Sequence, residues 1–194
     1  MKKSFTSLAV LATLLAAPMA SHALVYQFNA ALSGANEVPP SAATATGVAT
    51  LFYDDKSTAS LLDDTYNFSA SAFGLTGGSV AGTAASAYHI HAPAAAGVNG
   101  PVVVSLDAAP FVSFNSSSTL LVGGTNVTPP NTSFLANLQA SLAYVNIHTA
   151  ANPGGAIRGQ LIPVAVVPEP STYALMLGGL GLVGFLAQRR RPTR

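Results

Sequence analysis

The sequence of 194 residues contains no cysteine and no tryptophan, and only 8% of its residues are charged. Without cysteine, no disulfide can stabilise a domain in an oxidising compartment. Stability must then come from a packed core, from sheet hydrogen bonds or from a bound ion. Without tryptophan, stacking on sugar rings would depend on other aromatic residues such as tyrosine.

Positive charge is scarce between the two ends of the chain. Over residues 24–167, a stretch of 144 residues, two cations face six acidic residues, and the net charge is about −4 with neutral histidines. An acidic region without a basic patch argues against nucleic acid as a partner. The cations are Lys56 and Arg158, and the acidic residues are Glu37, Asp54, Asp55, Asp63, Asp64 and Asp107.

Residues 1–23 have the organisation of a secretory signal peptide. Lys2 and Lys3 form a positive start, and residues 8–17 are an apolar run that is too short to span a bilayer. Small residues then stand at the two cleavage-determining positions, so we expect cleavage after Ala23 and export through the secretion machinery. His22 would leave with this peptide.

The tail combines a proline-rich motif, an apolar run and a basic end. Pro168 and Pro170 flank Glu169 and favour an extended segment. A helix is expected over about residues 172–187. It would be shorter than the roughly 30 Å hydrocarbon core, which makes it marginal as a permanent transmembrane helix. Within the basic end, residues 189–194, a positive stop on the cytoplasmic side would be formed by Arg189, Arg190 and Arg191.

An ordinary C-terminal core helix is the alternative, but a run that is apolar all round argues against it. The tail, with Val-Pro-Glu-Pro-Ser-Thr at residues 167–172, a glycine-rich span and an arginine cluster, resembles the PEP-CTERM sorting signal of Gram-negative bacteria. The resemblance implies processing by an exosortase, a membrane transpeptidase-like enzyme. It also implies an inner-membrane intermediate held by the C-terminal helix, followed by the outer envelope or the extracellular space.

Alternating apolar and polar residues dominate the region between the two ends. Residues 26–32 and 66–72 alternate as half-buried strands do, and residues 48–53 form another apolar segment before a turn. Separators rich in Gly, Pro, Asn and Ser divide these segments from further strand candidates. Those further candidates are residues 87–91, 102–106, 111–114, 143–149 and 156–163.

Only residues 132–142 have the leucine spacing of a short helix. Many short strands with turn signals predict an all-β fold, either a β-sandwich or a barrel-like sheet, in a single domain over residues 24–163. Residues 164–194 would form the linker and sorting tail.

Three segments differ from generic β sequence and resemble, in this order, the CHRD domain, which is named for chordin. They are Leu-Ser-Gly-Ala-Asn-Glu-Val-Pro-Pro at residues 32–40, Tyr-His-Ile-His-Ala-Pro at residues 88–93 with the glycine-rich turn after it, and residues 144–161. Ala92 and Ala156 depart from the family pattern, which often has Gly and Glu there. The resemblance implies an extracellular β-sandwich-like module. Because no enzymatic activity is established for the family, we expect a protein that is not an enzyme.

The histidines are the strongest candidates for chemistry. His89 and His91 are two residues apart on a predicted strand and share one face. On another predicted strand, His148 shares a face with Asn146. If the two strands pair, three imidazoles could meet and bind zinc or copper. Alternatively, the histidines hydrogen-bond to backbone carbonyls or to Asn146 and close the loops that follow each strand.

The remaining polar residues offer weaker hypotheses. Arg158 is interpreted as a structural residue that bonds carbonyls near Gly154 and Gly155, or as a site for an anionic partner. Asn146 is grouped with it as a structural or binding-loop residue. The pairs Asp54-Asp55 and Asp63-Asp64 suit glycoside hydrolysis or calcium binding, but solvated turns explain them more simply.

We therefore expect a secreted or envelope-sorted, non-enzymatic binding or structural module associated with matrix or exopolysaccharide. The alternative is a zinc- or copper-binding extracytoplasmic protein that uses His89, His91 and His148. A hydrolase that acts on envelope polysaccharide through the aspartates is the third hypothesis.

Overall fold

A computed structural model describes residues 24–56, 58, 60–76, 87–165 and 170–189. The chain divides into two compact units, and the boundary between them falls after Pro163 in the sequence. The first is the β domain, and the second contains the C-terminal helix α3 (Pro170–Arg189). The predicted signal peptide lies outside the described residues, as do residues 168–169 and 190–191 of the sorting motif.

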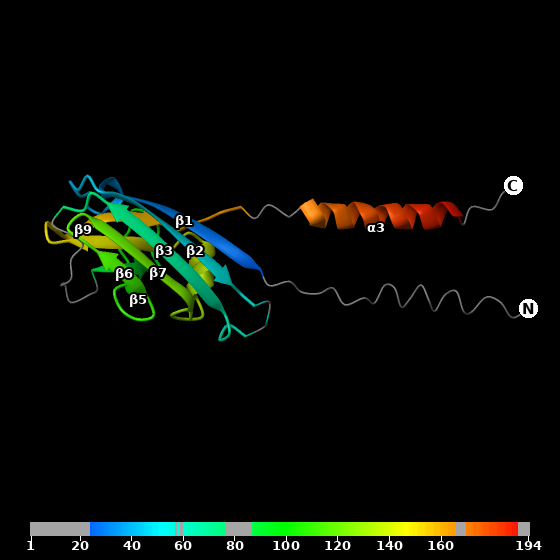
Figure 1. Cartoon of the computed structure of the whole chain (residues 1–194), viewed down its shortest axis with the longest axis horizontal. Helices are drawn as coiled ribbons and strands as arrows, with labels where there is room; N and C mark the ends of the chain where they lie inside the picture. Colours follow the sequence, from blue (N-terminus) through cyan, green and yellow to red (C-terminus); the bar gives the residue numbers. More distant parts are fainter. Residues whose placement is uncertain (1–23, 57, 59, 77–86, 166–169, 190–194) are drawn as a thin grey trace, which may run out of the picture. The chain divides into compact units, whose positions relative to one another are not determined.

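Ten strands in the described part of the chain form one antiparallel sheet (Figure 1). Its order is β5-β4-β8-β9-β1-β2-β3-β7-β6, and β10 pairs with β1 beside that path. The predicted all-β fold is confirmed in its barrel-like form, because one sheet curls into a half-barrel. The strands are β1 (Val25–Ser33), β2 (Thr46–Asp54), β3 (Thr65–Phe73), β4 (Tyr88–His91), β5 (Val102–Ser105), β6 (Val112–Asn115), β7 (Thr119–Val127), β8 (Tyr144–Thr149), β9 (Asn152–Gln160) and β10 (Ile162–Pro163).

Strands β1, β2, β3 and β7 have one buried face and one outer face. The pairing of β1 with β2 runs without interruption from Val25 opposite Asp54 to Ser33 opposite Thr46. Because side chains alternate along a strand, this register keeps Phe28 and Leu51 on the core face together. Apolar side chains from every strand except β6 and β10 then form one continuous core.

Two strand predictions were incomplete. Strand β7 was not predicted, because its buried positions include Gly124 and its glycine pair weakens the apolar alternation. Residues 152–155 were predicted as a separator, whereas β9 begins at Asn152. The pairing of Thr149 with Asn152 shows that the chain turns directly from β8 into β9.

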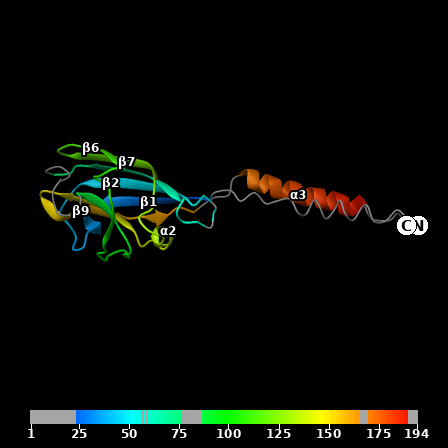
Figure 2. The ribbon, with the colours of Figure 1, turned by 90° about the horizontal axis from the view of Figure 1, so that it is seen from below.

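Two short helical segments complete the β domain. The helix α2 (Phe134–Gln139) is shorter than the predicted residues 132–142, and it buries Phe134 and Leu138 in the core. The Phe134 ring lies 5.4 Å from the Tyr66 ring, between centroids. Figure 2 shows α2 on one side of the β1–β2 pair, with β6 and β7 on the other. The 3-10 helix η1 (Gly34–Asn36) begins the segment that leaves β1.

The second unit contains the helix expected in the tail. In α3, the apolar side chains of residues 176–186 are exposed. The guanidinium carbon of Arg189 lies 5.3 Å from the centre of the Phe185 ring. Among the residues described, no helix has both the length and the hydropathy that crossing a membrane requires. The structure therefore gives no support to the expected transmembrane helix.

Candidate functional site

Adjacent strands bring the predicted site residues into two cross-strand rows. His89 on β4 stands opposite Asn146 on β8, which stands opposite Arg158 on β9. The next row places His91, Tyr144 and Gln160 side by side in the same way. Residues in one row share a face of the sheet, so the polar side chains of three strands form one polar layer.

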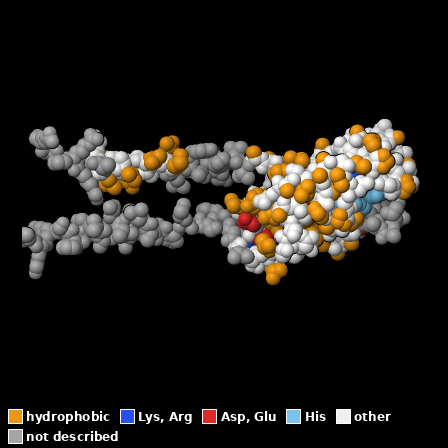
Figure 3. All heavy atoms as spheres, turned by 180° about the vertical axis from the view of Figure 1, so that it is seen from behind, with side chains coloured by type: hydrophobic (Ala, Val, Ile, Leu, Met, Phe, Trp, Pro, Cys, Tyr) orange, Lys and Arg blue, Asp and Glu red, His pale blue; other side chains and the backbone are white. Residues whose placement is uncertain are grey.

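The structure brings the three imidazoles together. The Nε2 atoms of His89 and His148 are 3.2 Å apart. The His89 ring centre lies 4.8 Å from that of His148 and 4.5 Å from that of His91. His89 is fully buried, whereas the other two are partly exposed. Figure 3, which views the domain from behind, shows histidine side chains at its surface.

Two of these rings are also bonded to backbone carbonyls. The Nδ1 atom of His91 lies 2.6 Å from the carbonyl oxygen of Gly100, and Nδ1 of His148 lies 2.8 Å from that of Pro153. These bonds close the segment after β4 and the turn after β8, as the alternative hypothesis for the histidines expected. Burial lowers the pKa of His91, and nearby His148 and Arg158 lower it further.

Tyr144 links His91 to Arg158. Its ring stacks on the His91 ring with 4.4 Å between centres and an angle of 10°. The guanidinium carbon of Arg158 lies 4.8 Å from the centre of the Tyr144 ring. The hydroxyl group of Tyr144 also accepts a hydrogen bond from the Gly100 amide at 3.3 Å. The sequence placed Tyr144 on this face but gave no sign of its role as the central ring.

Arg158 holds two segments of the chain against the sheet. Its Nε donates to the carbonyl oxygen of Asn36, and its Nη1 donates to Oδ1 of Asn99 at 2.9 Å. The side chain of Asn36 donates in return to the carbonyl oxygen of Arg158 at 3.1 Å. The predicted structural role is therefore consistent with these bonds, but the predicted contact near Gly154 and Gly155 is wrong. The carbonyl group comes from η1 instead.

Glu37 belongs to the polar layer, although it was not among the predicted site residues. Its side chain is 5% exposed, and burial raises its pKa from 4.5 to about 7, although Arg158 opposes this shift. A Cβ atom on Gly155 would lie 2.7 Å from the carboxyl oxygens of Glu37. Glu37 is a single acidic residue in a turn-like segment before two prolines. Nothing in the local sequence therefore predicted that its side chain would be buried.

A pocket of about 440 Å³ opens beside this layer. Glu37, Arg158 and Gln160 line it together with small residues of the segments that follow β1 and β4. The Gln160 amide donates to the carbonyl oxygen of Ala94, so the second of these segments is bonded to β9. The pocket is thus bordered by a carboxyl group, a guanidinium group and an amide.

Several polar atoms in the layer are buried without a hydrogen-bond partner within the described structure. The four atoms are Glu37 Oε1, His91 Nε2, Asn146 Oδ1 and Arg158 Nη2. Each such atom would normally be paired in a folded protein.

For the part of the chain described, no group of three or more His, Cys, Asp or Glu side chains is arranged to hold a metal ion.

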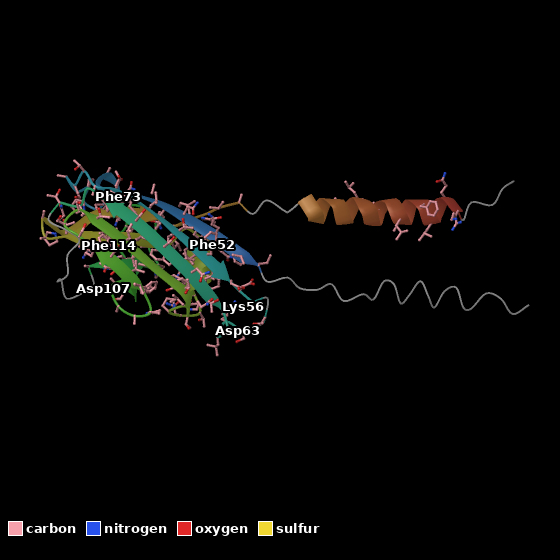
Figure 4. The ribbon with its side chains drawn as sticks, in the orientation of Figure 1. Phe52, Lys56, Asp63, Phe73, Asp107 and Phe114 are labelled. Carbon is pink, nitrogen blue, oxygen red and sulfur yellow. The ribbon has the colours of Figure 1, made fainter. Side chains whose placement is uncertain are left out.

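The aspartate pairs lie at the hairpin between β2 and β3 and satisfy local groups. Asp64 is buried and accepts a 2.7 Å hydrogen bond from the Tyr53 hydroxyl, while Asp63 accepts one from Thr58. Asp54 forms an ion pair with Lys56, and Asp55 accepts a bond from the amide of Leu24. The contacts of Asp54, Asp55 and Asp63 agree with the interpretation as solvated turn residues, whereas the burial of Asp64 shows that this interpretation was wrong for Asp64. Figure 4 labels Lys56 and Asp63 at this end of the domain.

The outer face of β2, β3, β7 and β6 is a second candidate surface. Phe52, Phe73 and Phe114 are exposed on it and are labelled in Figure 4. Cross-strand rows such as Thr50, Ser69 and Gly123 fill the space between these rings with small residues. The outward residues of β2 from Thr46 to Phe52 and those of β3 and β7 include no charged side chain.

A hollow of about 560 Å³ lies on this outer face. It has Phe52 at one side and Pro110 and Val112 at another, with the polar side chains of Asn67 and Ser69 between them. The surface therefore combines apolar rings with amide and hydroxyl groups in one shallow site.

Comparison with protein families agrees with this arrangement. The CHRD domain model matches residues 28–161, which include every strand from β2 to β9. This chain belongs to the CHRD domain family. A second model, the PEP-CTERM protein-sorting motif, matches residues 166–191. Neither curated proteins nor solved structures gave a match to the chain.

The match to the sorting motif indicates the destination of this CHRD protein. A PEP-CTERM signal implies processing by an exosortase and export to the cell envelope or the extracellular space. Arg189, the described member of the predicted arginine stop, lies at the end of α3.

Proposed function

We propose that this CHRD protein is a non-enzymatic binding module that an exosortase-type enzyme places in the outer envelope or extracellular matrix, where it associates with exopolysaccharide. The observation that carries the proposal is the outer face of β2, β3, β7 and β6, where the one charged outward residue, Asp54, is paired with Lys56. Polysaccharides present apolar ring faces and many hydroxyl groups, and this face offers both kinds of partner.

The aromatic residues of this face are phenylalanines. Phe52, Phe73 and Phe114 are 40%, 54% and 61% exposed. Apolar rings at such exposure lose water when a sugar ring covers them. Asn67, Ser69 and Thr125 border the same hollow and provide hydrogen-bond donors and acceptors to sugar hydroxyl groups. A neutral chain of sugars meets no unpaired charge on this surface.

Retention on a polysaccharide tests this proposal. The probe is cell-free exopolysaccharide purified from the producing strain, and the readout is the apparent Kd in a sedimentation assay with the full chain. Phe52→Ala should weaken binding about fivefold, because a stacked ring contributes on the order of 1 kcal/mol. The matched control is Leu62→Ala, which removes an exposed apolar side chain from the β2–β3 hairpin.

Equal binding by the wild type and Phe52→Ala would contradict the assignment of this face. An absence of binding by the folded wild type would contradict association with this exopolysaccharide.

Sorting is tested separately from binding. During processing, the tail is proposed to hold the protein at the inner membrane. Glu169→Ala should then leave the uncut chain in the inner-membrane fraction. Its mass should show that the whole tail is still attached. Glu37→Gln is the control, because it changes the other glutamate of the chain, which lies outside the tail. Normal release of Glu169→Ala would show that the Pro-Glu-Pro motif does not direct processing.

A further inference from the structure

The pair His89 and His148 has a geometry that suits a shared proton and equally suits a shared metal ion. Their Nε2 atoms face each other at 3.2 Å across the β4–β8 pair. Two imidazole nitrogens that bind one tetrahedral ion at about 2.0–2.1 Å are separated by about 3.3–3.4 Å. The observed separation is close to that of two ligands of a single metal ion.

The tautomer of His148 leaves this nitrogen available. A carbonyl oxygen can only accept, so Nδ1 of His148 carries the proton that bonds Pro153. In the neutral ring, Nε2 of His148 then carries no proton, and its lone pair accepts the hydrogen bond from Nε2 of His89. A metal ion bound by both nitrogens would replace this proton. Metal-binding histidines usually donate their other ring N–H to a carbonyl or carboxylate group, and His148 has this second bond already.

An oxygen donor lies on the same face. Asn146 stands opposite His89 and two residues before His148, and its buried Oδ1 has no hydrogen-bond partner among the residues described. His91 is held by Tyr144 and Gly100. Since no three His, Cys, Asp or Glu side chains of the described chain are set to hold an ion, we base the site on two imidazoles and an amide.

We propose that His89 and His148 bind one zinc or copper(II) ion through their Nε2 atoms, with Oδ1 of Asn146 as an oxygen ligand. Imidazole nitrogen suits both of these ions, and the absence of cysteine excludes competing thiolate sites. His148 is partly exposed, so an ion can enter from the surface without opening the core. This site lies apart from the proposed polysaccharide face and does not depend on that function.

The test uses the full chain, purified with an affinity tag that contains no histidine. Zn²⁺ and Cu²⁺ are each titrated alone by calorimetry, and bound metal is counted after dialysis. We expect one ion per chain, and the electron paramagnetic resonance spectrum of bound Cu²⁺ should show coupling to imidazole nitrogen. His148→Ala should weaken Zn²⁺ binding by on the order of 100-fold or more, because loss of a partner that only orients a ligand already costs about 10–100-fold.

Asp63→Asn is the control, because it removes an exposed carboxylate of the β2–β3 hairpin that has no part in the proposed site and should leave the affinity unchanged. Asn146→Asp provides an independent readout. If residue 146 is a metal ligand, its new carboxylate should strengthen Zn²⁺ binding. If Asn146 has only a structural role, the substitution should not strengthen binding. Circular dichroism establishes that each variant is folded.

Absence of a stoichiometric ion in the folded wild type would overturn the proposal. Wild-type affinity in folded His148→Ala would overturn it as well.

Discussion

The carboxyl group of Glu37 occupies the space that a side chain on Gly155 would need, with 2.7 Å between its oxygens and the position of such a Cβ atom. Glu37 directly follows the 3-10 helix η1, and Gly155 lies near the start of β9. They are 118 positions apart in the sequence, and their contact closes one side of the polar layer.

Gly155→Ala should therefore destabilise the domain. Gly155 has φ of +131°, where an L side chain is strained, and its Cβ atom would meet the buried carboxyl group. We expect the free energy of unfolding to fall by about 1–3 kcal/mol, measured by urea titration. Gly154→Ala is the control, because a Cβ atom there meets nothing within 4 Å. Equal effects of the two substitutions would contradict this account.

Glu37 should make the domain less stable as the pH rises. Burial raises its pKa from 4.5 to about 7, so the folded protein binds this proton more tightly than the unfolded chain does. The stabilisation is complete below pH 4.5 and is lost as the pH rises to about 7, with a maximum of about 3 kcal/mol. The contribution of Glu37 is measured by comparing the free energy of unfolding of the wild type and Glu37→Gln between pH 4.5 and about 7. Parallel pH profiles would show that Glu37 titrates normally.

The buried pair Tyr53 and Asp64 should matter more for stability than the exposed aspartates of the same hairpin. Burial and the neighbouring Asp64 raise the pKa of Tyr53, so the phenol remains a donor at 2.7 Å from the carboxylate. Tyr53→Phe should cost about 1–3 kcal/mol, because it leaves a buried carboxylate without this partner. Tyr26→Phe is the control, since its hydroxyl lies 3.5 Å from Asp55, and thermal unfolding should show a smaller loss.

Tyr144 should act mainly through its ring. Tyr144→Phe keeps the stack on His91 and the contact with Arg158, and it loses only the 3.3 Å bond from the Gly100 amide, at a cost of about 1 kcal/mol or less. Tyr144→Leu loses both ring contacts and should cost roughly 1–3 kcal/mol more. Chemical denaturation of both variants measures the difference. Similar losses would assign the contribution to the hydroxyl group.

Local pattern was enough to predict most of the strands. Residues 26–32 and 66–72 alternate apolar and polar side chains, and they form β1 and β3. This succeeds because a half-buried strand must repeat every two residues. Strand β7 was missed because its glycines reduce that alternation, and its pairing with β3 and β6 makes it a strand.

The sequence by itself determined the destination of this protein and the residue types of its polar layer. The sorting motif is a local signal that can be read in order along the chain, and the two histidines of β4 share a face through the period of a strand. The antiparallel register of β4, β8 and β9 decided which side chains meet there. Pairing between distant segments has no local signature, so the burial of Glu37 and the 3.2 Å approach of His89 to His148 arise only in the folded sheet.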